Sequence, residues 1–160
     1  MLALCIATTT QAHALYEVKD NLYFMKDDNE FSEEEMDEEA LYVHKICTQS
    51  AIQSTYFKCS CVAGAYRQGR EKQGPYIPQS QLLNNIYTTK SKECANIETI
   101  AGDTYAYCTN FVKSFRYREK NNNQYCQCVA NKTALAFKKD PRLSLNYIGD
   151  LRASAMTSCN

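Results

Sequence analysis

The sequence predicts an all-α protein, in which two tandem disulfide-stapled three-helix units pack into one compact domain behind a short N-terminal arm. Three observations predict this architecture. Apolar residues recur every three or four positions, as they do along one face of a helix. One pattern of cysteines occurs twice. The chain has 160 residues, of which 44% are hydrophobic, which is enough for one such domain.

Residues 1–14 are predicted to be a signal peptide that is truncated at its start. Residues 2–7 form a short apolar run, and Ala12 and Ala14 provide the small side chains that signal peptidase accepts before a cleavage site. No Lys or Arg precedes this run, so either the N-terminus is incomplete or the segment is a buried helix instead. Cleavage after Ala14 removes Cys5 and leaves an even number of cysteines, as an oxidised framework requires.

Residues 15–32 are predicted to form an N-terminal arm and an acidic segment. Residues 15–26 carry enough apolar side chains to cover the helices as an extended arm or short strand, or to contact a partner. Residues 27–39 include 9 acidic residues and no basic one. A calcium-binding EF-hand loop starting at Asp27 would place Phe31 where an oxygen ligand is needed, so no calcium site is predicted.

The cysteine pattern indicates an internal duplication. Each copy has a single cysteine, a Cys-x-Cys pair and another single cysteine, with separations of 12, 2 and 33 residues in the first and 18, 2 and 31 in the second. The flanks also match, since Val and Ala follow both pairs. We therefore predict two copies of one unit, residues 33–94 and 101–159, that differ by an insertion near residues 121–123. The eight cysteines are Cys47, Cys59, Cys61, Cys94, Cys108, Cys126, Cys128 and Cys159.

Each unit is expected to contain three helices. In the first unit, Ser32 and Glu35 form the pattern of a capping box at the start of a helix over about residues 33–53. In the second unit, Asp103 is the expected N-cap of the first helix. A helix that carries the Cys-x-Cys pair follows in each case. A proline precedes the third helix of each unit, at Pro78 and at Pro141.

The geometry of a helix restricts the disulfide pairing. Residues i and i+2 point about 200° apart, so the two members of a Cys-x-Cys pair must reach different helices. Cys61 is expected to share a helix face with Phe57 and Ala65, which favours it as the inward member. In the alternative pairing, Cys47 bonds to Cys59 and Cys61 bonds to Cys94. The spacing of the cysteines does not decide between the two pairings. The favoured pairs are Cys47–Cys61, Cys59–Cys94, Cys108–Cys128 and Cys126–Cys159.

Zinc binding and redox catalysis are two other interpretations of the cysteines. Structural zinc sites usually draw their ligands in closely spaced pairs, whereas the outer cysteines here are single and distant. A reactive dithiol needs a cation or a helix N-terminus beside it, but Lys58, which precedes Cys59, has no counterpart before Cys126. Structural disulfides are therefore favoured, and no metal or other cofactor is predicted.

Charge is unevenly distributed along the chain. Residues 41–160 contain 16 Lys or Arg and 7 Asp or Glu, so a basic body follows the acidic segment. These charges can stabilise helix termini, or they can attract an anionic surface. The chain has no nucleic-acid-binding motif and no apolar run long enough for a membrane span. The expected partner is thus a protein or an anionic envelope polymer, and the oligomeric state is left open.

The sequence offers few groups for catalysis. It has no glycine-rich phosphate loop and no nucleophile motif, and His44 is the one histidine left after cleavage.

The predicted function is an exported binding protein without catalytic activity, in the periplasm or secreted: an envelope accessory, an inhibitor or immunity-type protein, or an effector. The alternatives are a small-molecule or lipid carrier with a cleft between the two units, and an enzyme of unknown class. The residues expected to contact a partner are Tyr66, Arg67, Arg70, Arg116, Tyr117 and Arg118.

Overall fold

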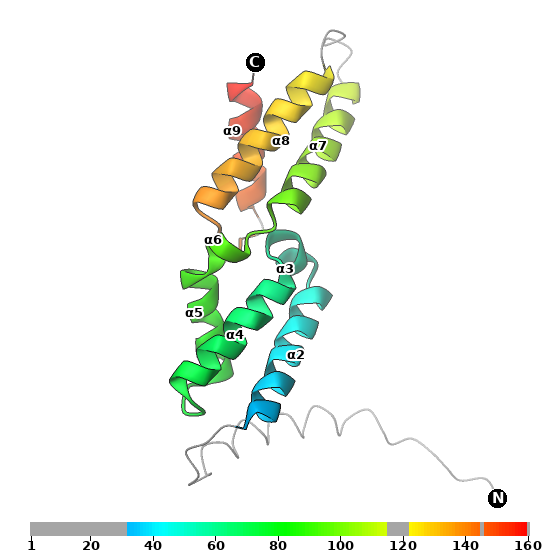
Figure 1. Cartoon of the computed structure of the whole chain (residues 1–160). Helices are drawn as coiled ribbons and strands as arrows, with labels where there is room; N and C mark the ends of the chain where they lie inside the picture. Colours follow the sequence, from blue (N-terminus) through cyan, green and yellow to red (C-terminus); the bar gives the residue numbers. More distant parts are fainter. Residues whose placement is uncertain (1–31, 115–121, 145, 160) are drawn as a thin grey trace, which may run out of the picture.

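A computed structural model describes residues 32–114, 122–144 and 146–159. The predicted all-α class is confirmed, since no strand is present in these ranges. The predicted signal peptide and arm lie outside the described residues. Figure 1 shows an elongated molecule in which the long helices of each half lie side by side. The first half contains α2 (Glu33–Gln49), α4 (Cys59–Gln73) and α5 (Gln79–Thr89), and the second contains α7 (Ile97–Ser114), α8 (Asn122–Lys139) and α9 (Tyr147–Ser158).

The first helix begins where the sequence predicts but ends earlier. The Ser32 side chain accepts a hydrogen bond from the backbone N–H of Glu35, and the Glu35 carboxylate accepts one from the backbone N–H of Ser32, so the predicted capping box is confirmed. The predicted helix over 33–53 is interrupted at Ser50, whose backbone is extended (φ −87°, ψ 111°). The Ser50 hydroxyl then caps a separate short helix, α3 (Ala51–Tyr56).

The start of the first helix in the second half differs from the expectation. Asp103 is not an N-cap, because α7 begins at Ile97 and Asp103 lies exposed within it. The backbone N–H of Asn96 donates to the carbonyl of Tyr56 at 2.8 Å, and the carbonyl of Asn96 accepts from Ile100 at 3.1 Å. The helix start is thus set by contact with α3 rather than by a local capping residue.

The third helices follow the two prolines. Helix α5 begins directly after Pro78, and the short α6 (Ser91–Cys94) completes the first half. Helix α9 begins at Tyr147, some residues beyond Pro141. Within each half the middle helix packs against both of its neighbours, and α3 contacts α7 where the halves meet. The division into two repeated units stays a prediction.

The four disulfides follow the alternative pairing, so the favoured pairing is wrong. Helix α4 begins at Cys59, so Phe57 lies before the helix and does not share its face with Cys61. The antiparallel neighbours α2 and α4 bring the last turn of α2 beside the first turn of α4, where the sulfur of Cys59 meets that of Cys47. Cys61 is half-buried and reaches Cys94 on α6. The bonds are Cys47–Cys59, Cys61–Cys94, Cys108–Cys126 and Cys128–Cys159.

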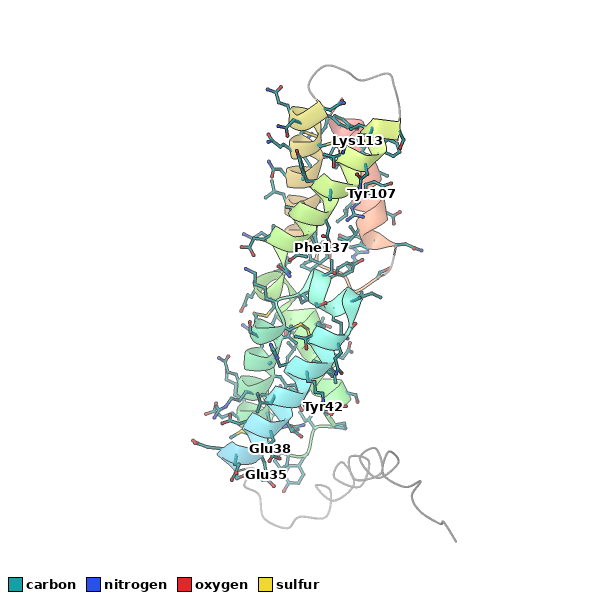
Figure 2. All side chains as sticks on the ribbon, turned by 90° about the vertical axis from the view of Figure 1, so that its right-hand side faces the viewer. Glu35, Glu38, Tyr42, Tyr107, Lys113 and Phe137 are labelled. Atoms are coloured by element: carbon teal, nitrogen blue, oxygen red, sulfur yellow. A yellow bond between two sulfur atoms is a disulfide. The ribbon has the colours of Figure 1, made fainter. Side chains whose placement is uncertain are left out.

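Aromatic side chains fill the junction between the halves. Phe137, which Figure 2 places midway along the molecule, is fully buried. Its ring centroid lies 5.5 Å from that of Tyr56, 6.1 Å from that of Phe57 and 6.2 Å from that of Tyr147. These contacts place residues of both halves in one continuous hydrophobic core. In the described part of the chain, no helix has the length and apolar character needed to cross a membrane.

Candidate functional site

The structure places the predicted contact residues in different environments. Tyr66 is 0% exposed and Arg70 is 2% exposed, so the prediction that they contact a partner is wrong. Their spacing of four residues puts both on the face of α4 that packs inward. Arg67 is half-exposed and pairs with Asp37. The other three predicted contacts lie outside the described residues, namely Arg116, Tyr117 and Arg118.

Tyr66 and Arg70 belong to a buried polar network with Glu39 of α2. The Tyr66 hydroxyl and the Arg70 Nε both donate to Oε2 of Glu39, at 2.8 and 2.7 Å, and Arg70 Nη2 donates to the Tyr66 hydroxyl at 2.8 Å. Arg70 Nη1 also donates to the carbonyls of Gly74 (3.1 Å) and Ile77 (2.6 Å) in the loop before α5. Burial, followed by the charge of Glu39, raises the pKa of Tyr66 well above its usual range. The network joins α2, α4 and the loop, and its role is structural.

An open groove of about 480 Å³ lies between α2 and α4 on their outward side. Most of its lining is apolar, and Leu41 is 70% exposed at its edge. Gly64 leaves the groove open on the α4 side, because a Cβ added there would meet no atom within 4 Å. The groove is lined by Asp37, Ala40, Leu41 and His44 of α2 and by Ser60, Ala63, Gly64 and Arg67 of α4.

One end of the groove is held by a covalent bond. The Cys47–Cys59 disulfide joins the last turn of α2 to the first residue of α4, next to Ser60 of the groove lining. The polar network of Glu39 and Arg70 joins the same two helices further along. The separation of α2 and α4 is thus fixed at both ends, and the groove is formed before any ligand arrives.

The other end of the groove is acidic. The Arg67 guanidinium donates to a carboxylate oxygen of Asp37, and this bond is the main cause that raises the pKa of Arg67. The charges of Glu33, one turn before Asp37 on α2, and Glu71, one turn after Arg67 on α4, raise this pKa further. Three acidic residues and one cation, Arg67, thus lie at this end of α2 and α4, which makes it acidic.

His44 lies at the edge of the groove and is exposed. A catalytic histidine is normally oriented by a second group that bonds to its ring. Among the described residues, no side chain forms a hydrogen bond or ion pair with His44. The enzyme alternative therefore has no supporting geometry at this residue.

Comparison with known proteins adds no assignment for this groove. No family model, curated protein or solved structure matches the chain. Within the described ranges, no group of three or more His, Cys, Asp or Glu side chains is arranged to hold a metal ion. The groove itself was not predicted from the sequence, because its two sides come from helices whose packing the local pattern does not show. Leu41, an apolar residue directly after the acidic run, is a signal in the sequence that could have pointed to it.

Proposed function

We propose that the chain is an exported binding protein that holds an amphipathic helix of a partner protein in the groove between α2 and α4. The observation that carries this proposal is an open, mainly apolar groove between two helices that are cross-linked by a disulfide. Amphipathic helices commonly bind by laying their apolar face into such a groove. A groove that is already rigid loses little conformational entropy on binding, which favours affinity.

The shape of the groove suits a helix. Ala40, Ala63 and Gly64 present small side chains, and the distance at which two helices pack depends on the size of the side chains at the contact. From Asp37 to His44 the groove follows α2 for about 10 Å at 1.5 Å per residue. A partner helix would therefore contribute two or three apolar residues spaced by three or four positions.

The charge at the end of the groove restricts the partner further. The carboxylates around Arg67 favour an occupant that carries Lys or Arg at one end. Residues 15–26 of the chain are a less suitable occupant, because they contain two basic and two acidic residues. We therefore infer that the occupant is a basic amphipathic helix from another protein.

Two further observations support this function over the alternatives. Disulfides are typical of proteins in oxidising compartments, which supports export to the periplasm or beyond the cell together with the predicted signal peptide. The carrier alternative expects a cleft between the two halves, but aromatic side chains pack closely where the halves meet. The enzyme alternative has no such observation in its favour.

A blocked groove tests the proposal. The probe is a fluorescent helical peptide of about 15 residues with Leu on one face and Lys on the other, long enough to form a helix on binding. A second peptide carries Glu in place of Lys. In Gly64→Trp the indole would occupy the open space beside α2, and we expect the affinity for the Lys peptide to fall by about tenfold or more. At the groove, the Glu peptide should displace the Lys peptide only at concentrations at least about tenfold higher than the unlabelled Lys peptide requires.

The matched control is Asn131→Trp. Asn131 is exposed and follows the Cys-x-Cys pair of α8 at the same distance as Gly64 follows that of α4. Both variants should keep the melting curve of the unmodified protein, and the control should keep its affinity for the Lys peptide. Equal affinities of the two variants for the Lys peptide would contradict the proposal, as would displacement of the Lys peptide by the Glu peptide at a lower concentration than the unlabelled Lys peptide requires. If dodecanoate binds and Gly64→Trp blocks it while no peptide binds, the groove is a carrier site. If deletion of residues 1–26 is needed before the Lys peptide binds, the occupant is the chain's own N-terminal segment.

A further inference from the structure

Arg152 of α9 lies beside the exposed ring of Tyr107 of α7, which stacks on a second exposed ring, that of Phe111. Its Nε donates to the buried hydroxyl of Thr104 at 3.1 Å, and its guanidinium lies 5.0 Å from the centre of the Tyr107 ring. The rings of Tyr107 and Phe111 are stacked, with centroids 6.3 Å apart, and are 46% and 41% exposed. Figure 2 shows Tyr107 on the face of the molecule turned to the viewer. The four residues are named the Arg152 site below.

The Arg152 guanidinium has donors that the described residues do not use. Its one hydrogen bond within that part of the chain is made by Nε, and no described carboxylate lies within 4.0 Å of it. Asp103, one turn before Tyr107 on α7, forms no ion pair with it. In the first half, by contrast, Arg70 uses Nε, Nη1 and Nη2 in hydrogen bonds. Among the described residues, both Nη atoms of Arg152 thus have no hydrogen-bond partner.

The guanidinium is also held in place before any ligand arrives. The bond to Thr104, which is 0% exposed, and the contact with the Tyr107 ring restrict the side chain to one orientation. An arginine whose two Nη atoms face the same way matches the two oxygens of a carboxylate. The described residues from 95 onward carry six Lys or Arg and four Asp or Glu, so the net charge of this half is positive, which favours an anionic partner.

We propose that the Arg152 site binds an acidic segment of a partner protein. A carboxylate of Asp or Glu accepts hydrogen bonds from both Nη atoms of Arg152. An apolar or aromatic side chain next to it in the partner packs on the rings of Tyr107 and Phe111, where aromatic contacts add to the area buried. This surface belongs to α7 and α9, so it is separate from the groove between α2 and α4 and binds a ligand of opposite charge.

The experiment measures binding of a fluorescent Glu/Tyr copolymer to the full oxidised protein at physiological salt. Arg152→Gln removes the cation and should weaken binding by about tenfold or more. The matched control is Arg142→Gln, because the Arg142 guanidinium also lies over a tyrosine, 5.4 Å from the Tyr147 ring centre, but is already paired with Asp140 at 2.5 Å. This control should bind as the unmodified protein does. Tyr107→Ala should weaken binding, whereas Tyr107→Phe should retain it.

One further variant excludes an effect on folding. Arg152→Lys keeps the positive charge without the planar pair of donors, so it should keep the melting temperature and still lose most of the affinity. Equal losses in Arg152→Gln and Arg142→Gln would overturn the proposal, since they would show attraction to overall charge. Binding of heparin that depends on Arg152, without binding of the copolymer, would also overturn it and identify an anionic polysaccharide as the ligand.

Discussion

The two halves of the molecule place different chemistry at matched positions of their helices. When Cys47 is aligned with Cys108 and Cys59 with Cys126, each residue of the polar network has a counterpart in the second half. All six side chains are buried, with at most 8% of their surface exposed. The matched residues are Glu39 and Ile100, Tyr66 and Thr133, and Arg70 and Phe137.

The difference between Arg70 and Phe137 follows from what lies beyond the ends of α4 and α8. Arg70 lies near the end of α4, where it donates to two carbonyls of the loop before α5. Phe137 lies near the end of α8, but this end meets α3 and its aromatic residues at the junction. The same disulfide pairing thus supports a charged, hydrogen-bonded network in one half and uncharged side chains at the matched positions of the other. Neighbours from outside the matched helices decide which side chain is suitable.

The largest expected effect tests whether the shared disulfides stabilise both halves equally. Cys47 and Cys59 replaced by Ser, or Cys108 and Cys126 replaced by Ser, should each lower the free energy of unfolding by about 3 kcal/mol, because loops of 12 and 18 residues have similar closure entropies. Reduction of all four bonds should remove on the order of 10 kcal/mol, comparable to the whole stability of a typical domain. Urea unfolding followed by circular dichroism measures these losses. An unchanged urea midpoint after complete reduction would show that the disulfides are dispensable.

The next effect addresses the polar network itself. Arg70→Met leaves Glu39 buried without a cation and should cost about 3–5 kcal/mol of stability. The triple variant with Glu39→Leu, Tyr66→Phe and Arg70→Met makes the first half resemble the second, and it should lie within about 2 kcal/mol of the unmodified protein. Thermal and urea unfolding of both variants provide the test. A triple variant less stable than Arg70→Met would mean that the polar core cannot be exchanged for an apolar one.

The smallest expected effect is a pH dependence of stability that comes from Tyr66. The matched residue of the second half, Thr133, cannot contribute one. Tyr66 has a raised pKa in the folded state because it is buried beside Glu39, whereas in the unfolded chain it ionises near its usual value of 10.0. Its contribution to stability is therefore present below pH 10 and is lost as the pH rises above 10. Burial also raises the pKa of Tyr56, Tyr87 and Tyr147, so part of this loss will remain without Tyr66. Urea midpoints at about pH 8 and about pH 11 should differ less for Tyr66→Phe than for the unmodified protein, and equal differences would contradict the assignment.

Local signals in the sequence predict the fold better than they predict its contacts. The start of α2 depends on Ser32 and Glu35, three positions apart, and was found correctly. The break at Ser50 and the start of α7 at Ile97 were missed, because α3 and its contacts with the second half determine them. The disulfide pairing was missed because it depends on where α4 begins.

The candidate site was harder to predict for the same reason. Glu39 was one of several acidic residues at a helix start, and its burial follows from Arg70, which lies 31 positions later. The groove requires two helices to be placed side by side at a known rotation. The Arg152 site joins residues of α7 and α9 that lie up to 48 positions apart, so no local pattern shows it.

Each of the four disulfides joins two cysteines of the same half, which determines how the oxidised chain would carry a mechanical load. A pulling force applied at Cys47 and Cys159 would cross directly from sulfur to sulfur and bypass the enclosed loops. Only residues 59–61, 94–108 and 126–128 lie on the path that remains. Between Cys47 and Cys159, the oxidised chain can therefore lengthen appreciably at one place, the connection from α6 through the first turns of α7.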